Sequence, residues 1–121
     1  MLAEKVVTAV ARGTANTRWR DFVDMYALAM RHPVNGATFR ASLERVAQYR
    51  KLILAPLASV LVGYPEIAQS RWAAWLRKQK LETTIPTEFS AVLDYVVSFA
   101  DPIISGQAGD RGLWDPAQRR W

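Results

Sequence analysis

The sequence predicts an all-α fold, a single helical-bundle domain of about five to six helices with a loose C-terminal tail. Apolar residues recur at intervals of three and four along most of the chain, which is typical of helices with one buried face. No segment shows the strict apolar and polar alternation of a strand. Glycine and proline signals divide the chain into helix-sized pieces. We therefore expect a helical domain over residues 1–105 and a flexible tail over residues 106–121.

The first expected helix covers about 11 residues and ends before Gly13. Its apolar face is formed by Leu2, Val6, Val7 and Val10. A polar linker over residues 13–17 leads to a second helix, for which Thr17 is the predicted N-cap and His32-Pro33 the end. The apolar face of this second helix is formed by Phe22, Met25, Tyr26 and Ala29. Together these two helices are expected to begin the core.

Asn35-Gly36 predicts a turn, after which a third helix should run to about Arg50. The next segment, residues 52–62, is the most apolar run of the chain and is broken by Pro56. This segment is either a short helix or an extended stretch, and the shared face of its later apolar residues favours a helix. The run is too short to span a membrane, so we expect no membrane partner.

Two further helices are expected. Pro65 suits the first turn of one of them, which should stop near Gln79. Thr87-Glu88 should cap a final helix that ends at Asp101-Pro102. The last residues are rich in glycine, proline and charge, which is the composition of a loosely attached tail.

The formal net charge is +5, and all of the excess lies in the first half of the chain. Residues 1–60 hold nine Lys and Arg against four Asp and Glu, whereas residues 61–121 hold seven of each. A basic half of this kind fits either a polyanionic partner, such as nucleotide phosphates or RNA, or a merely solubilising charge. The absence of cysteine excludes disulfides, zinc–thiolate sites and thiol catalysis, and together with the lack of a secretory leader it predicts a cytoplasmic location.

The second helix carries the residues with the clearest chemical potential. Asp21 and Asp24 are three residues apart and share a face, and Arg20 lies four residues before Asp24. A solvated helix face with an Arg–Asp pair has the same spacing. A functional interpretation needs cations and a phosphate-bearing ligand, and Lys5 on the first helix and Arg18 at the head of the second supply the cations.

These residues resemble a known family. Glu4-Lys5, followed by the run from Arg12 to Tyr26 with its Arg-x-Arg-Asp-x-x-Asp element, is similar to the AbiEii/AbiGii nucleotidyltransferase toxins of type IV toxin–antitoxin systems. The Arg71-Trp72-Ala73-Ala74-Trp75 run and the Phe99-Ala100-Asp101-Pro102 segment resemble the C-terminal domain of actinobacterial members. The resemblance covers the chain from Ala3 to about Pro102.

The resemblance implies a role for each matched residue. Lys5 and Asp21 would be catalytic, and Lys5, Arg18 and Arg20 would bind the nucleotide. Asp24 would either support Asp21 or fix Arg18 and Arg20 in position. The family transfers a nucleotide to an acceptor, which in toxins of this type can be tRNA, so Mg²⁺ and a nucleoside triphosphate are implied for a complete enzyme. An antitoxin protein is an implied partner.

Family enzymes also need an N-terminal half with a Gly-Ser loop and paired acidic metal ligands, and we find neither motif in this sequence. We therefore expect the chain alone to bind no metal or cofactor and to be inactive without such a half. A truncated product, one half of a split toxin and a decayed remnant all fit this expectation. Outside the family, a non-enzymatic helical module that binds RNA or a partner protein is the alternative, and a stable domain without activity is the third.

Other candidates are weaker. Gly106, Gly109 and Gly112 follow no strand and open no helix, which favours a flexible tail over a phosphate-binding loop. His32 has no second histidine or cysteine to form a metal site with. The aromatic and basic residues of the tail fit either packing on the domain, which we prefer, or RNA contact; they are Trp114, Arg119, Arg120 and Trp121.

Overall fold

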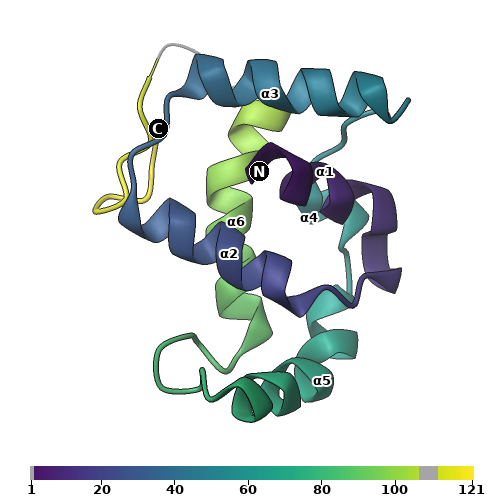
Figure 1. Ribbon diagram of the computed structural model, residues 1–121, viewed down its shortest axis with the longest axis vertical. Coiled ribbons are helices and arrows are strands. Elements are labelled where there is room, and N and C mark those ends of the chain that lie inside the picture. The colour runs from purple at the N-terminus through teal and green to yellow at the C-terminus, as the bar shows by residue number, and fades with distance from the viewer. Residues whose placement is uncertain (1, 107–111) are drawn as a thin grey trace.

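The computed structural model describes residues 2–106 and 112–121, and within these ranges it confirms the all-α fold (Figure 1). Six α-helices and one short 3₁₀ helix form the described part, and its only extended pairings are two isolated bridges. In chain order the elements are α1 (Leu2–Arg12), η1 (Gly13–Ala15), α2 (Trp19–Arg31), α3 (Gly36–Tyr49), α4 (Leu57–Val60), α5 (Tyr64–Gln79) and α6 (Phe89–Ile104). No described helix has the length and apolar character needed to cross a membrane.

Helix α6 is the centre of the fold. It packs against α2, α3, α4 and α5, and in Figure 1 it runs behind α2 through the middle of the molecule. Helix α1 covers another side of the core by packing against α2, α3 and α4. Buried apolar residues form a wide face along α6, as expected for a helix that packs against several neighbours. The pair α1 and α2, which carries the candidate site residues, is thus held on a shared core.

The link between α1 and α2 ends the first helix as predicted and begins the second differently. Gly13 has φ +54°, a left-handed conformation in which glycine is favoured at helix ends. The predicted N-cap Thr17 is wrong, because the N-cap position is Arg18 and no side chain caps the helix there. Instead the Oδ1 of Asn16 accepts a hydrogen bond from the Arg18 N–H at 2.7 Å, which forms a local turn.

Helix α3 begins at the predicted turn, and the Asn35 side chain accepts a hydrogen bond from the Thr38 N–H at 2.9 Å. The apolar run over residues 52–62, for which the sequence allowed a short helix or an extended stretch, contains both. Residues 52–56 are not helical, and only the four residues of α4 are. Asp101 on α6 caps α4, because its carboxylate accepts hydrogen bonds from the N–H groups of Leu57 at 2.7 Å and Ala58 at 3.0 Å.

The start of α6 is held by a side chain of α5. Glu88 provides no side-chain cap for α6. Gln69 of α5 takes that role, since its side chain accepts from the Phe89 N–H at 2.8 Å and donates to the Thr87 carbonyl at 2.7 Å. The predicted end at Asp101-Pro102 is wrong because α6 continues through Pro102 to Ile104. Burial of the last two residues of α6 favours this continuation.

Aromatic side chains form two separate clusters in the core. The first cluster lies around α5 and contains Trp19, Phe22, Tyr64, Trp72, Trp75 and Phe89. The second lies around α6 and contains Tyr26, Phe39, Tyr95, Phe99, Trp114 and Trp121. Edge-to-face and offset contacts of this kind add to the free energy gained by burying the rings.

The C-terminal segment is irregular, yet its aromatic residues are held on the domain. Trp114 is fully buried, and its indole N–H donates to the Ala29 carbonyl at 2.6 Å. Trp121 donates its indole N–H to the Phe99 carbonyl at 2.8 Å. The packing that we preferred for these side chains is therefore present. The remaining part of the expected flexible tail, residues 107–111 with Gly109, lies outside the described residues.

Candidate functional site

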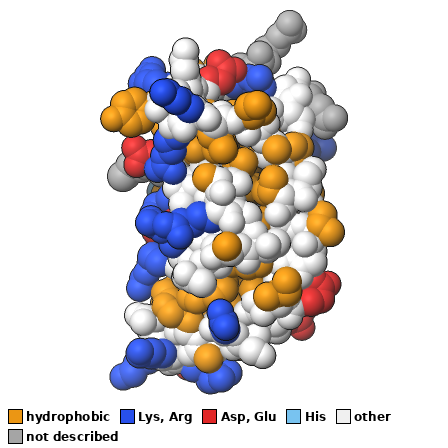
Figure 2. All heavy atoms as spheres, turned by 90° about the vertical axis from the view of Figure 1, so that its right-hand side faces the viewer, with side chains coloured by type: hydrophobic (Ala, Val, Ile, Leu, Met, Phe, Trp, Pro, Cys, Tyr) orange, Lys and Arg blue, Asp and Glu red, His pale blue; other side chains and the backbone are white. Residues whose placement is uncertain are grey.

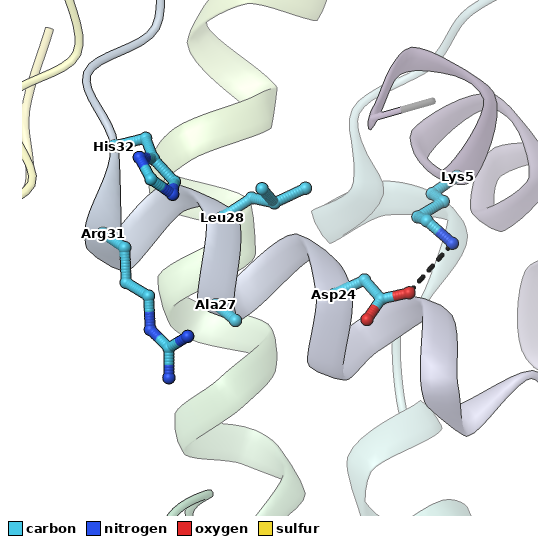
Figure 3. Close-up of a pocket in the computed structure, with 6 residues that line it drawn as sticks. All are labelled: Lys5, Asp24, Ala27, Leu28, Arg31 and His32. Atoms are coloured by element: carbon cyan, nitrogen blue, oxygen red, sulfur yellow. Dashed lines mark ion pairs between the residues drawn. The ribbon is translucent and has the colours of Figure 1, made fainter.

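Lys5 on α1 lies between the two carboxylates of α2. Its Nζ is 3.2 Å from the Oδ1 of Asp21 and 3.0 Å from the Oδ2 of Asp24. Figure 3 shows the Lys5 side chain reaching from α1 toward Asp24. The spacing of the two aspartates puts both on the face of α2 that α1 covers. The juxtaposition of Lys5 and Asp21 that the sequence motif requires is therefore present.

The two carboxylates keep Lys5 charged. The pKa of Lys5 is raised above its ordinary value of 10.5, chiefly by its hydrogen bond to Asp24. Burial opposes this shift, and the hydrogen bond to Asp21 adds to it. Two acids around one base leave a local excess of negative charge, so further cations are needed nearby before an anion can bind.

Clefts open on both sides of Lys5, and each aspartate faces one of them. The first cleft has a volume of about 220 Å³ and is lined by Glu4, Lys5, Thr8, Arg18, Asp21 and Arg50. The second has a volume of about 410 Å³ and is lined by Lys5, Asp24, Ala27, Leu28, Arg31 and His32 (Figure 3). We refer to the first as the Asp21 cleft and to the second as the Asp24 cleft. The Asp21 cleft contains more of the predicted site.

Arg18 reaches the Asp21 cleft from a fixed loop. Its backbone N–H is bound by the Asn16 side chain, and the Asn16 carbonyl accepts a hydrogen bond from the Tyr64 hydroxyl. Asn16 is 2% exposed, and burial of a polar residue is tolerated when its groups are hydrogen-bonded in this way. The loop is thus anchored to α5, and Arg18 is held at the start of α2, where backbone N–H groups favour anions.

Arg20 is not brought to either cleft. Its guanidinium lies over the Trp75 ring of α5, with Cζ 5.4 Å from the ring centroid, in a cation–π contact. Arg20 and Asp21 are successive residues of α2 and therefore point in different directions around the helix. In this structure Arg20 contributes to the packing of α2 on α5.

Sequence reasoning missed Arg50 and Thr8, which also line the Asp21 cleft. Arg50 follows α3 and donates a hydrogen bond from its guanidinium to the Thr8 Oγ1 at 2.8 Å. Thr8 stands among the apolar residues of α1, and this hydroxyl on a buried face was the one available signal. Nothing in the local pattern connects it to an arginine 42 residues away.

The lining of the Asp21 cleft includes three cations. Among residues 2–106 and 112–121, no group of three or more His, Cys, Asp or Glu side chains is arranged to hold a metal ion. Lys5, Arg18 and Arg50 converge on the Asp21 cleft from three different elements. Ammonium and guanidinium groups that converge in this way match the oxygens of a phosphate group.

The remaining candidates lie elsewhere. His32 lines the Asp24 cleft and is exposed. Gly106 has φ +68° and lies against the Arg40 guanidinium, and Gly112 accepts a backbone hydrogen bond from Gly36. Arg119 lies over the Tyr95 ring, with Cζ 4.5 Å from its centroid.

A family model described as "Nucleotidyl transferase AbiEii toxin, Type IV TA system" matches residues 1–95. The match includes both clefts and the helices that form them. No curated protein matches the chain, and no solved structure matches it either.

Proposed function

The chain belongs to the AbiEii family of nucleotidyl transferase toxins from type IV toxin–antitoxin systems, and we propose that it supplies the helical side of a nucleotide-transfer site. The observation that carries the proposal is the Lys5 ammonium 3.2 Å from the Asp21 carboxylate, in a cleft that Arg18 also lines. The matched region, residues 1–95, includes every residue that lines this cleft.

The reaction requires phosphate binding and charge stabilisation. Lys5 and Arg18 would hold the phosphates of a nucleoside triphosphate in the Asp21 cleft. An acceptor hydroxyl oxygen then bonds to the α-phosphorus and releases its proton to solvent water, while the bond from that phosphorus to the pyrophosphate oxygen breaks. The leaving pyrophosphate takes the electron pair, and nearby cations stabilise its developing charge.

The two aspartates have different parts in the proposal. Asp21 shares the cleft with the proposed phosphate site, and it would touch the reacting groups while orienting the Lys5 ammonium. Asp24 holds the same ammonium from the side of the other cleft and acts as a positioning residue. Arg20 packs α2 on α5 through its contact with Trp75. Its contribution to nucleotide binding would therefore be indirect, through the placement of Arg18 and Asp21.

The remaining parts of the enzyme would come from partners. Mg²⁺ supplies charge neutralisation of the phosphates when it is bound, and we propose that its carboxylate ligands belong to a nucleotidyltransferase half of the family type. The acceptor would be a tRNA, which places the protein in the cytoplasm, and an antitoxin would restrain the assembled enzyme. The chain by itself would then lack transfer activity.

Reconstitution tests this function. The full chain is mixed with a separately expressed N-terminal domain from the family, labelled nucleoside triphosphates and tRNA, and transfer of label to tRNA is measured. Lys5→Met and Asp21→Asn should each reduce transfer at least about a hundredfold, the size typical of lost charge stabilisation. The exposed controls Lys78→Met and Asp94→Asn should leave transfer unchanged. Equal activity in the site and control variants would disprove the assignment.

An RNA-binding module without catalytic activity is the second candidate, and the distribution of basic residues favours it. Figure 2 shows Lys and Arg side chains gathered in a column along one edge of the face that it presents. Binding of RNA to such a column would weaken steeply with added salt, whether or not Asp21 is present. Salt-dependent tRNA binding by Asp21→Ala, with no transfer by any reconstituted mixture, would favour this candidate.

A further inference from the structure

We propose that Arg50 and Thr8 form a second phosphate-binding position in the Asp21 cleft, which they line together with Lys5 and Arg18. The inference rests on the proposed function, because it assigns a further contact to the same cleft. The ligand class is a phosphate group, carried either by a nucleoside triphosphate or by the backbone of an acceptor strand.

The guanidinium of Arg50, an exposed residue, is oriented by one hydrogen bond to the buried Thr8. Thr8 is 7% exposed, so its hydroxyl is set by the packing of α1, and it accepts from the Arg50 Nη1 at 2.8 Å. Helices α1 and α3 pack directly on each other, which holds the donor and the acceptor on adjoining elements. A guanidinium held in this way loses less conformational entropy when it binds a ligand than a free side chain does.

The guanidinium retains capacity for a ligand. The Thr8 bond uses one of its several N–H donors. Within residues 2–106 and 112–121, no carboxylate lies within ion-pairing distance of Arg50, whereas Lys5 is engaged by two. A guanidinium presents its donors in a planar fork that matches two oxygens of one phosphate.

The electrostatics of the cleft require such a cation. Glu4 and Asp21 line the same cleft, and Lys5 is shared with Asp24. A phosphate that approached Lys5 alone would meet two nearby carboxylates. With Arg18 and Arg50, three cations balance the three acids in or beside the cleft. Without Arg50 the acids would outnumber the cations and disfavour a phosphate.

Binding measurements on the full chain test the proposal. Calorimetric titrations use inorganic tripolyphosphate in one arm, and a single-stranded RNA oligonucleotide with hydroxyl groups at both ends in the other. The variants are Arg50→Gln and Lys5→Met, with Arg45→Gln as the matched control because Arg45 is an exposed arginine of the same helix region. Arg50→Gln should weaken binding of at least one probe about tenfold, the size of one charge-assisted hydrogen bond.

The two arms identify the source of the phosphate. A loss confined to tripolyphosphate assigns the position to the nucleotide, and a loss confined to the oligonucleotide assigns it to the acceptor strand. If Arg50→Gln behaves like Arg45→Gln in both arms while Lys5→Met loses affinity, this inference fails and the proposed function stands. If the wild-type chain binds neither probe, the proposed function fails together with this inference. The same holds if Lys5→Met and Arg50→Gln both bind the probes with the affinity of the Arg45→Gln control.

A purely structural role for Arg50 gives a different result. Thr8→Val removes the hydroxyl with little change in shape, and the melting temperatures of both variants are measured with and without tripolyphosphate or the oligonucleotide. A structural bond would lower both melting temperatures equally and leave the increase caused by the probe unchanged. The proposal requires Arg50→Gln to reduce that probe-dependent increase. Arg50→Lys, which retains the charge without the fork, should restore part of it.

Discussion

The hydroxyl of Tyr64 on α5 donates a hydrogen bond to the backbone carbonyl of Asn16, in the loop between α1 and α2. The same asparagine holds the first turn of α2 through the Arg18 N–H. One buried tyrosine thus helps to hold the start of α2, close to Lys5 and Asp21. The stability and the site geometry of this protein are therefore coupled at Tyr64.

Tyr64→Phe should change the pH dependence of stability. Burial raises the pKa of Tyr64 from 10.0 to about 12, so between these values the unfolded chain releases a proton that the native chain retains. The free energy of unfolding of the wild type should therefore fall across this window by on the order of 2 kcal/mol more than that of the variant. At neutral pH the variant should be less stable by about 1 kcal/mol, because the Asn16 carbonyl loses its donor. Urea unfolding from pH 8 to 11.5 measures both effects, and parallel profiles would contradict the prediction.

Lys5→Met should lower the free energy of unfolding by roughly 0.5–1 kcal/mol, the range of a partly exposed ion pair. The raised pKa of Lys5 means that its contribution is present below about pH 10.5 and is lost as the pH rises through the folded-state value. A double-mutant cycle with Asp24→Asn measures the pair directly. A coupling energy of zero, with Lys78→Met as the exposed control, would show that the ion pair contributes nothing to stability.

Trp114→Phe should destabilise the domain by about 2–3 kcal/mol. The substitution removes the hydrogen bond to the Ala29 carbonyl and leaves space at a fully buried position. Trp75→Phe serves as the control, because Trp75 is only partly buried and should cost less. Thermal unfolding of both variants measures the difference. Equal melting temperatures would mean that the C-terminal segment adds little to the core.

Asp101→Ala should cost about 1–2 kcal/mol, the effect of losing a helix cap. The side chain accepts hydrogen bonds from two N–H groups at the start of α4, and both would lose their partner. Asp94→Ala changes an exposed aspartate of the same helix and should be nearly neutral. Hydrogen exchange of the Leu57 and Ala58 amides gives a local readout, and unchanged protection in Asp101→Ala would rule out the capping role.

Local signals in the sequence predicted most of the helices. Gly13, Asn35 and Pro65 marked helix boundaries, because each of these residues acts through its own backbone or through near neighbours. The errors occurred where a distant residue took over a local role. The cap of α6 comes from Gln69 on another helix, and α6 continues past Pro102 because Ile103 and Ile104 are buried by the surrounding elements.

The same distinction applies to the candidate site. Lys5 and Asp21 were recognised through a motif, and the structure brings their side chains together. Their roles in catalysis remain predictions. Arg20 carries the same charge as Arg18 but packs on Trp75, and residue type alone did not distinguish the two. Arg50 reached the cleft through the packing of α3 on α1, a relationship that no spacing in the sequence encodes.

Because both aromatic clusters contain tryptophan, intrinsic fluorescence can report on each of them. Trp19, Trp72 and Trp75 belong to the cluster at α5, whereas Trp114 and Trp121 belong to the cluster at α6. Replacing the tryptophans of one cluster by phenylalanine leaves tryptophan emission from the other cluster alone. Unfolding or ligand binding can then be followed separately at each cluster. Tyr64, which anchors the α1–α2 loop, belongs to the first cluster and stacks on Trp19. The tryptophan emission of that cluster would therefore report changes at this loop without an attached label.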